Sequence, residues 1–348
     1  MRFIHGRLSA IVIITAIFLS PLGARGVDDS EVKDLSDRIV QTGPSAFIVE
    51  NALYLFPEAQ NRVVALADGD QGGGFFVGDL DPLINEKTVL PRRATTEEVL
   101  AQNPDIVVMK NFLKRSMGEP LERVGVPVVY LNLETPEFWM AELDLLGELF
   151  ANPRRAEELK GIFERRISSV TEPLEVLADD DKPTVLFLYW SIKDGVSAVN
   201  IPPVSWIQTR MVEMSGGVPV WRNADLDERW TRTNVEQIAL WNPDHIVVAA
   251  YHMDASAAVN SMLEDPIWSS LTAVKEGRVH AFPSDYHSWD QPDARWLLGL
   301  AWLAGELHPG FFDSLNMKNE SRSFYREMYG MDDEKYNELI LPRLTGLD

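Results

Sequence analysis

The chain has 348 residues, a formal net charge of −21 and no cysteine. The acidic balance argues against nucleic acid and anionic lipid as partners, because both would be repelled by such a surface. The missing cysteine excludes disulfides, a thiol nucleophile, iron–sulfur ligation and a lipid anchor on an N-terminal cysteine.

The first residues have the pattern of a secretory signal. Arg2 and Arg7 give a positive start, residues 8–19 are apolar apart from one serine and one threonine, and residues 24–26 offer a cleavage site. The apolar run is short for a membrane span, so an uncleaved anchor is the less favoured alternative. We expect residues 1–26 to be a signal peptide, and the protein to be a soluble periplasmic protein rather than a lipoprotein.

The mature protein would then comprise residues 27–348. Removal of residues 1–26 takes away three arginines and no acidic residue, which leaves 29 basic against 53 acidic residues and a net charge of −24. A chain of this length with ordinary apolar content predicts two domains rather than one.

The part of the chain from 27 to 150 alternates short apolar runs with helical patterns. Strands are predicted at 38–40, 62–66, 106–109 and 126–131, and helices at 45–55, 97–101, 120–124 and 138–150. This alternation predicts a mostly parallel sheet covered by helices. Between Asp68 and Ala94 the alternation fails and a long loop is expected, whose glycines fit neither a dinucleotide fingerprint nor a phosphate loop.

The longest helical pattern begins at Asn152 and continues to about Leu177. Its apolar residues recur at steps of three and four, Asn152 suits an N-cap, and Pro153 suits the first helical position. About 25 residues at roughly 1.5 Å each make a rod of about 35–40 Å, and Pro173 is expected to kink it or end it early. We predict a spine helix over residues 151–178 that joins two lobes.

The chain after this helix repeats the chain before it. Strands are predicted at 184–190 and 279–282, and helices at 205–214 and 268–274. Residues 97–108 read EEVLAQNPDIVV, and residues 236–247 read EQIALWNPDHIV, which align without a gap. The repeat predicts two lobes of like architecture. We place an N-terminal lobe at 27–150, a C-terminal lobe at 179–310 and a helical tail at 311–348.

These motifs resemble the periplasmic substrate-binding proteins of ABC importers for iron–siderophore, haem and vitamin B12. A glutamate, six residues, Pro-Asp and an apolar strand occur in each half, and residues 268–283 read WSSLTAVKEGRVHAFP. The tail from 324 to 340 is similar to that of iron-complex members. The resemblance covers essentially the whole mature chain and implies a two-lobed α/β fold with a ligand cleft between the lobes.

The resemblance also implies partners for the protein. It implies a monomer that delivers a small molecule to a membrane permease dimer with its ATPase, without a cofactor of its own. In that family one glutamate of each lobe docks on permease arginines, and the matching positions are Glu97 and Glu236, each seven residues before its proline. The plainer interpretation is that both are acids favoured at a helix N-terminus.

Ligands of open α/β sheets bind outside the carboxyl ends of the strands, which selects a set of candidate ligand residues. Arginine suits anionic groups through forked hydrogen bonds, and aromatic rings suit a flat chelate. The ligand-binding candidates are Arg92, Arg93, Tyr189, Trp190, Trp230, His252, Asp285, Tyr286, His287 and Trp289.

The ligand itself is left open by the sequence. Trp230 stands where the vitamin B12 protein has a cleft tryptophan, but its counterpart in the first half is Pro91, followed by Arg92 and Arg93. This disfavours a corrinoid and favours a ligand with negative charge, held by Arg92 or Arg93 together with Trp230. An iron chelate such as a siderophore or haem is the leading prediction, and a corrinoid or a molybdate or tungstate oxyanion is the alternative.

Two other classes of site receive little support. His252, His287 and Asp285 could meet around a metal ion, but no H-x-x-E-H or H-E-x-x-H pattern is present, so no direct metal site is predicted. An acid–base enzyme built on Asp285, His287 and Arg92 lacks a nucleophile motif and a phosphate loop. We therefore expect a binding protein and not an enzyme.

Overall fold

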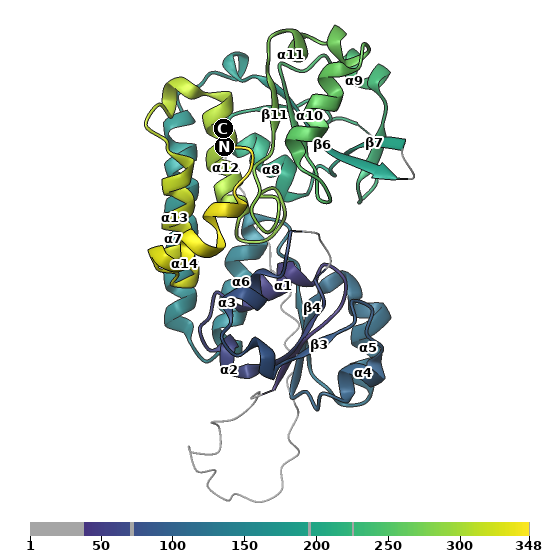
Figure 1. Ribbon diagram of the computed structural model, residues 1–348, viewed down its shortest axis with the longest axis vertical. Coiled ribbons are helices and arrows are strands. Elements are labelled where there is room, and N and C mark those ends of the chain that lie inside the picture. Colours follow the sequence, from purple (N-terminus) through teal and green to yellow (C-terminus); the bar gives the residue numbers. More distant parts are fainter. Residues whose placement is uncertain (1–37, 70–72, 194–195, 225, 348) are drawn as a thin grey trace, which may run out of the picture. The chain divides into compact units, whose positions relative to one another are not determined.

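The computed structural model describes residues 38–69, 73–193, 196–224 and 226–347, so the predicted signal peptide lies outside the described residues. All of these residues belong to one unit, Ser36–Asp348, which holds two sheets (Figure 1). In this described part, no helix is both long and apolar enough to cross a membrane.

Sheet A is wholly parallel and has the order β3-β2-β1-β4-β5. Its carboxyl ends therefore meet at one edge. The strands are β1 (Ile39–Gln41), β2 (Val63–Ala67), β3 (Thr88–Leu90), β4 (Ile106–Lys110) and β5 (Val128–Leu131). The helices between them are α1 (Ala46–Leu53), α2 (Ala59–Arg62), α3 (Phe76–Leu80), α4 (Thr96–Leu100) and α5 (Glu119–Arg123).

The prediction of a long loop between Asp68 and Ala94 was wrong. The segment contains α3, a 3-10 turn at Ile84–Glu86 and the edge strand β3. Thr88 and Val89 of β3 are exposed and only Leu90 is buried, so this strand shows no apolar pattern. Tertiary pairing with β2, rather than local periodicity, defines β3.

The predicted spine helix is α7 (Pro153–Leu174), which follows α6 (Pro136–Leu149). The 22 residues of α7 span about 33 Å, and Asn152 caps its start by accepting from the Arg155 N–H. The helix ends at Leu174, directly after Pro173, three residues earlier than predicted. A Cβ on Gly147 would lie 2.7 Å from the Ala156 Cβ, so glycine permits the close turn between α6 and α7.

Sheet B has the order β11-β10-β6-β7-β9, with β8 paired to β6. The strands are β6 (Thr184–Lys193), β7 (Val196–Ile201), β8 (Val218–Pro219), β9 (Thr231–Thr233), β10 (His245–Ala249) and β11 (Val279–Ala281). β7 runs antiparallel to both β6 and β9, so sheet B is mixed. β7 and β9 are not predicted from the sequence, because neither carries a continuous apolar run.

Seven α-helices follow α7 among the described residues, and a 3-10 turn directly precedes one of them. They are α8 (Ile207–Met214), α9 (Val235–Trp241), α10 (Ala255–Glu264), a 3-10 turn (Trp268–Ser270) with α11 (Thr272–Lys275), α12 (Trp296–Leu307), α13 (Met317–Tyr329) and α14 (Asp333–Leu339). The single helix predicted at 268–274 is thus two pieces. α13 runs alongside α7 (Figure 1), where Arg166 bonds to Glu320 and Glu327.

The internal repeat is confirmed as two helix–turn–strand units, α4–β4 and α9–β10. Asn242 ends α9 and Asn103 lies in the turn after α4, both in the left-handed region with φ of 43° and 50°, which asparagine tolerates. The aspartate two residues later bonds to the backbone of the neighbouring strand in each half. Asp105 accepts from the Arg38 N–H at 3.0 Å, and Asp244 accepts from the Thr184 N–H at 2.8 Å. The N-P-D turn therefore ties each unit to its sheet.

Candidate functional site

A cavity of about 190 Å³ lies where strands of both sheets end, and we call it the ligand pocket. Ser45 and Glu134 follow strands β1 and β5 of sheet A, and Tyr251 follows β10 of sheet B. This is the place at which open α/β sheets bind ligands. The lining residues are Ser45, Phe47, Ile48, Glu134, Trp206, Gln208, Trp230, Tyr251, Gln291 and Pro292.

One wall of the ligand pocket is aromatic. Tyr189 stacks on Tyr251 with ring centroids 4.3 Å apart, and Trp230 lies 5.3 Å from Tyr189. Trp206 meets Trp230 edge-on at 5.6 Å. Trp206 and Trp230, which both line the ligand pocket, each carry an indole N–H that can donate a hydrogen bond. The wall thus offers flat apolar faces together with two N–H donors.

Two helices begin at the ligand pocket. Ser45 precedes α1 with φ 60° and ψ 31°, an uncommon conformation for serine, and its side chain does not cap the helix. Trp206 precedes α8, which also has no side-chain cap. The first N–H groups of a helix lack partners within the helix and carry partial positive charge. The two N-termini make the ligand pocket favourable to negative charge.

The charged groups at the rim are paired and held in place. Lys110 is 2% exposed and donates to Glu134 at 2.7 Å, and it also donates to the Asn132 carbonyl. Glu142 accepts from the N–H groups of Asn132 and Leu133 at 2.7 and 2.8 Å. Burial raises the pKa of Glu142 to about 7. These contacts fix the segment after β5 and balance the charge of Glu134.

A buried carboxylate lies beneath the ligand pocket. Asp290 is 0% exposed, and its Oδ2 accepts from the Tyr251 hydroxyl at 2.7 Å and from Gln208 Nε2 at 3.3 Å. Burial raises the pKa of Asp290 and also that of the Tyr251 phenol. Asp290 therefore fixes the orientation of two side chains that line the ligand pocket, those of Tyr251 and Gln208.

A second cavity, of about 270 Å³, shares Tyr251 with the ligand pocket. It is lined by four of the predicted ligand residues, namely His252, Asp285, Tyr286 and His287. The His287 ring stacks on Phe47 at 4.2 Å, and burial holds the pKa of His287 well below its ordinary value. His287 is accordingly a neutral imidazole at the boundary of the two cavities.

Three predicted ligand residues, Asp285, Trp289 and Trp190, are buried in the protein interior. Asp285 has a fully buried side chain that accepts from Arg295 Nε at 2.8 Å, Trp289 Nε1 at 2.8 Å and the Tyr325 hydroxyl at 2.6 Å. Trp289 is 0% exposed beside it. Trp190 lies on the face of β6 opposite to Tyr189 and packs near Trp268 in the core.

The predicted arginines lie elsewhere. Arg92 and Arg93 are exposed on the segment between β3 and α4, and neither lines the ligand pocket around Trp230. No arginine of the described residues lines that pocket. The positive ends that face it are the two helix N-termini instead.

The predicted docking glutamates occupy matching positions. Glu97 and Glu236 are both exposed in the first turns of α4 and α9. Their role in docking is still a prediction.

Among the residues that the structure describes, no group of three metal-ligating side chains comes together.

Several pocket residues were missed from the sequence. Glu134 and Tyr251 closely follow predicted strands, so the rule for strand ends could have found them. Trp206 follows a Pro-Pro pair after β7, a strand that was itself missed. Ser45 and Gln208 carry no signal in the sequence, because only the folded chain shows that their helices begin at the same pocket.

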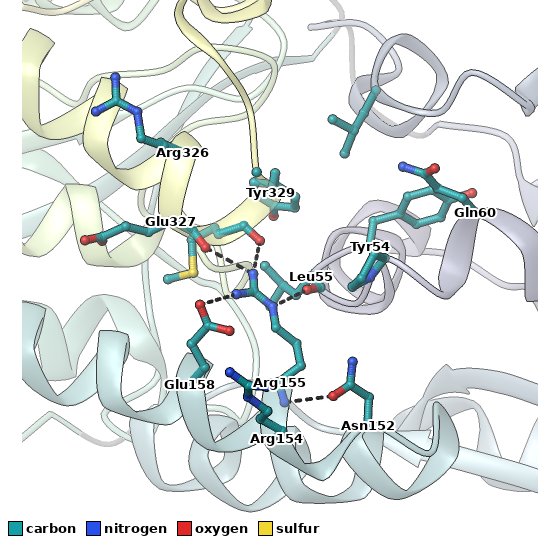
Figure 2. Close-up of a pocket in the computed structure, with 14 residues that line it drawn as sticks. Tyr54, Leu55, Gln60, Asn152, Arg154, Arg155, Glu158, Arg326, Glu327 and Tyr329 are labelled. Carbon is teal, nitrogen blue, oxygen red and sulfur yellow. Dashed lines mark hydrogen bonds and ion pairs between the residues drawn. The ribbon is translucent and has the colours of Figure 1, made fainter.

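A larger cavity, of about 600 Å³, lies at the start of α7 (Figure 2). Arg155 stands at its centre and donates to the carbonyls of Leu55, Glu327 and Met328, while pairing with Glu158 at 3.1 Å. Its guanidinium is therefore occupied by the protein's own backbone. This cavity lies where Arg155 of α7 links the segment after α1 to α13.

Comparison with known proteins agrees with this geometry. Residues 86–286 match the family described as periplasmic binding protein. The molybdate-binding protein MolA of Haemophilus influenzae is 24% identical over 255 residues, which cover 67% of this chain and 69% of MolA. The structure of MolA bound to molybdate matches with a TM-score of 0.67, 20% identity and coverage of 86% and 94%.

Two further relatives carry other descriptions. The iron-uptake system-binding protein of Bacillus subtilis is 22% identical over 189 residues, covering 53% of this chain and 56% of that protein. A periplasmic solute binding protein from Veillonella parvula matches in structure with a TM-score of 0.68, 21% identity and coverage of 88% and 92%. The resemblance and the two-lobed α/β fold predicted from the sequence are thus confirmed. The chain belongs to the periplasmic binding protein family, the solute-binding proteins of ABC importers.

Proposed function

We propose that this protein captures a small, oxygen-rich anion in the ligand pocket and delivers it to a membrane permease. The observation that carries this proposal is the convergence of two helix N-termini, those of α1 and α8, on one cavity. The indole N–H groups of Trp206 and Trp230 add two further donors. These donors suit the oxygen atoms of an anion, and Lys110 balances the charge of Glu134 in the lining.

The size of the ligand pocket favours a small ligand. Drug-sized ligands occupy pockets of about 300–1,000 Å³, whereas this cavity is about 190 Å³. A small oxygen-rich anion therefore ranks ahead of the iron chelate, and a corrinoid is the least favoured. The likeness to MolA supports this order.

An iron chelate is the second candidate, because the cavity of about 270 Å³ adjoins the ligand pocket at Tyr251. A flat chelate that filled both cavities could stack against the aromatic wall. Co-crystal structures would separate the two ligands, since the oxyanion leaves the cavity around His252 and His287 empty.

Calorimetric titration of the mature protein with molybdate, tungstate, sulfate, phosphate, a ferric siderophore and haemin tests the proposal. We expect saturable 1:1 binding of at least one oxyanion. Trp206→Phe and Trp230→Phe each keep an aromatic ring and lose one N–H donor, which should weaken binding about 10- to 100-fold. Trp241→Phe on α9 is the matched control. Binding of the siderophore or haemin alone would overturn the proposal.

We further infer that the protein acts in the periplasm as a monomer and that Glu97 and Glu236 dock on a permease dimer with its ATPase. Both carboxylates are exposed. Glu97 lies on the helix before β4 of sheet A, and Glu236 lies on the helix before β10 of sheet B. The N-P-D turns connect both helices to their strands in the same way. Two equivalent acids on separate units can report their spacing to two basic surfaces.

A further inference from the structure

The hydrogen bonds around Asp290 run in a defined direction. Oδ2 of Asp290 accepts the single hydroxyl proton of Tyr251 at 2.7 Å, so the phenol oxygen has only lone pairs left. The same Oδ2 faces Gln208 at 3.3 Å. Because Oδ2 is an acceptor, the amide atom beside it is Nε2.

Gln208 therefore turns its other amide atom, Oε1, away from the carboxylate. Gln208 is 2% exposed and lines the ligand pocket, and its Oε1 has no hydrogen-bond partner among the described residues. A buried acceptor without a partner is costly, which points to a ligand that donates to it. The carboxylate of Glu134 is a further acceptor in the same lining.

The ligand pocket thus has two chemically distinct sides. Trp206, Trp230 and the starts of α1 and α8 supply donors, whereas Gln208 and Tyr251 supply acceptors. A fully deprotonated oxyanion has acceptors only and would leave the Gln208 Oε1 unpaired and repelled. An anion that carries one O–H or N–H group satisfies both sides.

We propose that Asp290 is a positioning residue that makes the ligand pocket select anions carrying a hydrogen-bond donor over fully deprotonated oxyanions. This inference rests on the proposed function and narrows its ligand class. Protonated oxyanions and anionic hydroxy acids belong to the selected class, and sulfate and molybdate to the rejected one. Sites built around a hydrogen bond reject analogues that lack it more strongly than apolar sites do.

Two probe anions of equal charge test the proposal. Hydrogen phosphate and sulfate are both tetrahedral dianions near pH 8, and only hydrogen phosphate carries an O–H group. Calorimetry on the mature protein should show hydrogen phosphate binding about 100-fold or more tightly than sulfate. Molybdate should bind as weakly as sulfate.

Variants connect this ratio to Asp290. In Asp290→Asn the new amide can donate to the phenol oxygen, so the Tyr251 proton becomes available to the ligand. The preference for hydrogen phosphate should then fall at least about tenfold, with sulfate affinity rising. Tyr251→Phe keeps the stack on Tyr189 and removes one acceptor, so it should also reduce the preference, even if Asp290→Asn fails to fold.

Tyr54→Phe is the matched control, because Tyr54 donates to Asp81 at 2.5 Å in the same kind of buried pair away from the ligand pocket. Its anion preference should equal that of the wild type. Equal binding of sulfate and hydrogen phosphate by the wild type would overturn the inference and leave the proposed function intact. Failure of every small anion to bind would overturn the proposed function itself.

Discussion

The ring of His287 stacks on the ring of Phe47 with centroids 4.2 Å apart, which joins the loop after sheet B to the helix after β1 of sheet A. His287 is 4% exposed, and burial lowers its pKa well below the ordinary value. The contact therefore requires an uncharged imidazole, and it lies at the edge of the ligand pocket.

Stability should fall as the pH drops below about 6.5, the ordinary histidine pKa. Burial also lowers the pKa of His245 to about 4, helped by its neighbour His280. In the unfolded chain both His245 and His287 take up protons at higher pH than in the fold. The contribution of the neutral rings to the unfolding free energy is therefore fully present above about pH 6.5. Below that pH, each buried histidine lowers the unfolding free energy by up to about 1.4 kcal/mol per pH unit.

Urea unfolding at pH 7, 6 and 5 measures this slope. His287→Gln should reduce the dependence on pH, and His252→Gln, at an exposed position, should not. Because protonation of Glu142, whose pKa is about 7, acts in the opposite direction over the same range, the comparison with the variant decides: equal pH dependence in the wild type and His287→Gln would contradict the neutral, buried state of this ring.

Loss of Asp285 should destabilise the fold rather than alter ligand choice. Its carboxylate and the Arg295 guanidinium are both fully buried and lie 2.8 Å apart. Asp285→Asn removes one of the two carboxylates that pair with the buried Arg295, while Asp293 keeps its contact at 2.6 Å, and the loss should cost up to about 3–5 kcal/mol. Thermal unfolding should show a large loss, while the protein that is still folded keeps its ratio of anion affinities. Unchanged stability together with lost anion binding would show instead that Asp285 belongs to the ligand site.

The Asp285 case shows where prediction from sequence fails. The run from Asp285 to Trp289 has the composition of a binding loop, and nothing local reveals that Arg295 and Tyr325 fold onto the acid. Tyr189 and Trp230, which were selected from strand ends and the repeat, lie 5.3 Å apart, and their contact with a ligand is still a prediction. Trp190 could have been excluded, since neighbours on a strand face opposite sides.

The elements that the sequence predicted well are those with local signals. α7 has a capping asparagine and a long apolar stripe, and the two N-P-D turns have identical letters. β3 and β9 have three residues each and exist through pairing with β2 and β7. Short edge strands of this kind carry too few apolar residues to be recognised from periodicity.

Replacement of Glu97 or Glu236 by alanine should weaken stimulation of the cognate transporter ATPase without changing ligand affinity. Both side chains are exposed, and neither lines the ligand pocket. Glu172→Ala, an exposed acid on α7, should leave stimulation unchanged. A double variant that loses ligand affinity instead would show that these acids serve the binding site.

Ligand binding should change the dimensions of the protein only slightly. α7 is a single helix of 22 residues, and Arg155 at its start bonds to the ends of α1 and α13. A stiff helix tied at one end resists hinge motion better than flexible connecting strands would. Small-angle scattering with and without ligand should give nearly equal radii of gyration, and a large difference would be inconsistent with this spine.

The claim that a small anion occupies the ligand pocket is tested most directly by native mass spectrometry of the protein released gently from the periplasm. We expect a single adduct with the mass of one small anion, lost in the Trp206→Phe, Trp230→Phe double variant and kept in Trp241→Phe. An adduct with the mass of a ferric siderophore, haem or corrinoid would contradict it.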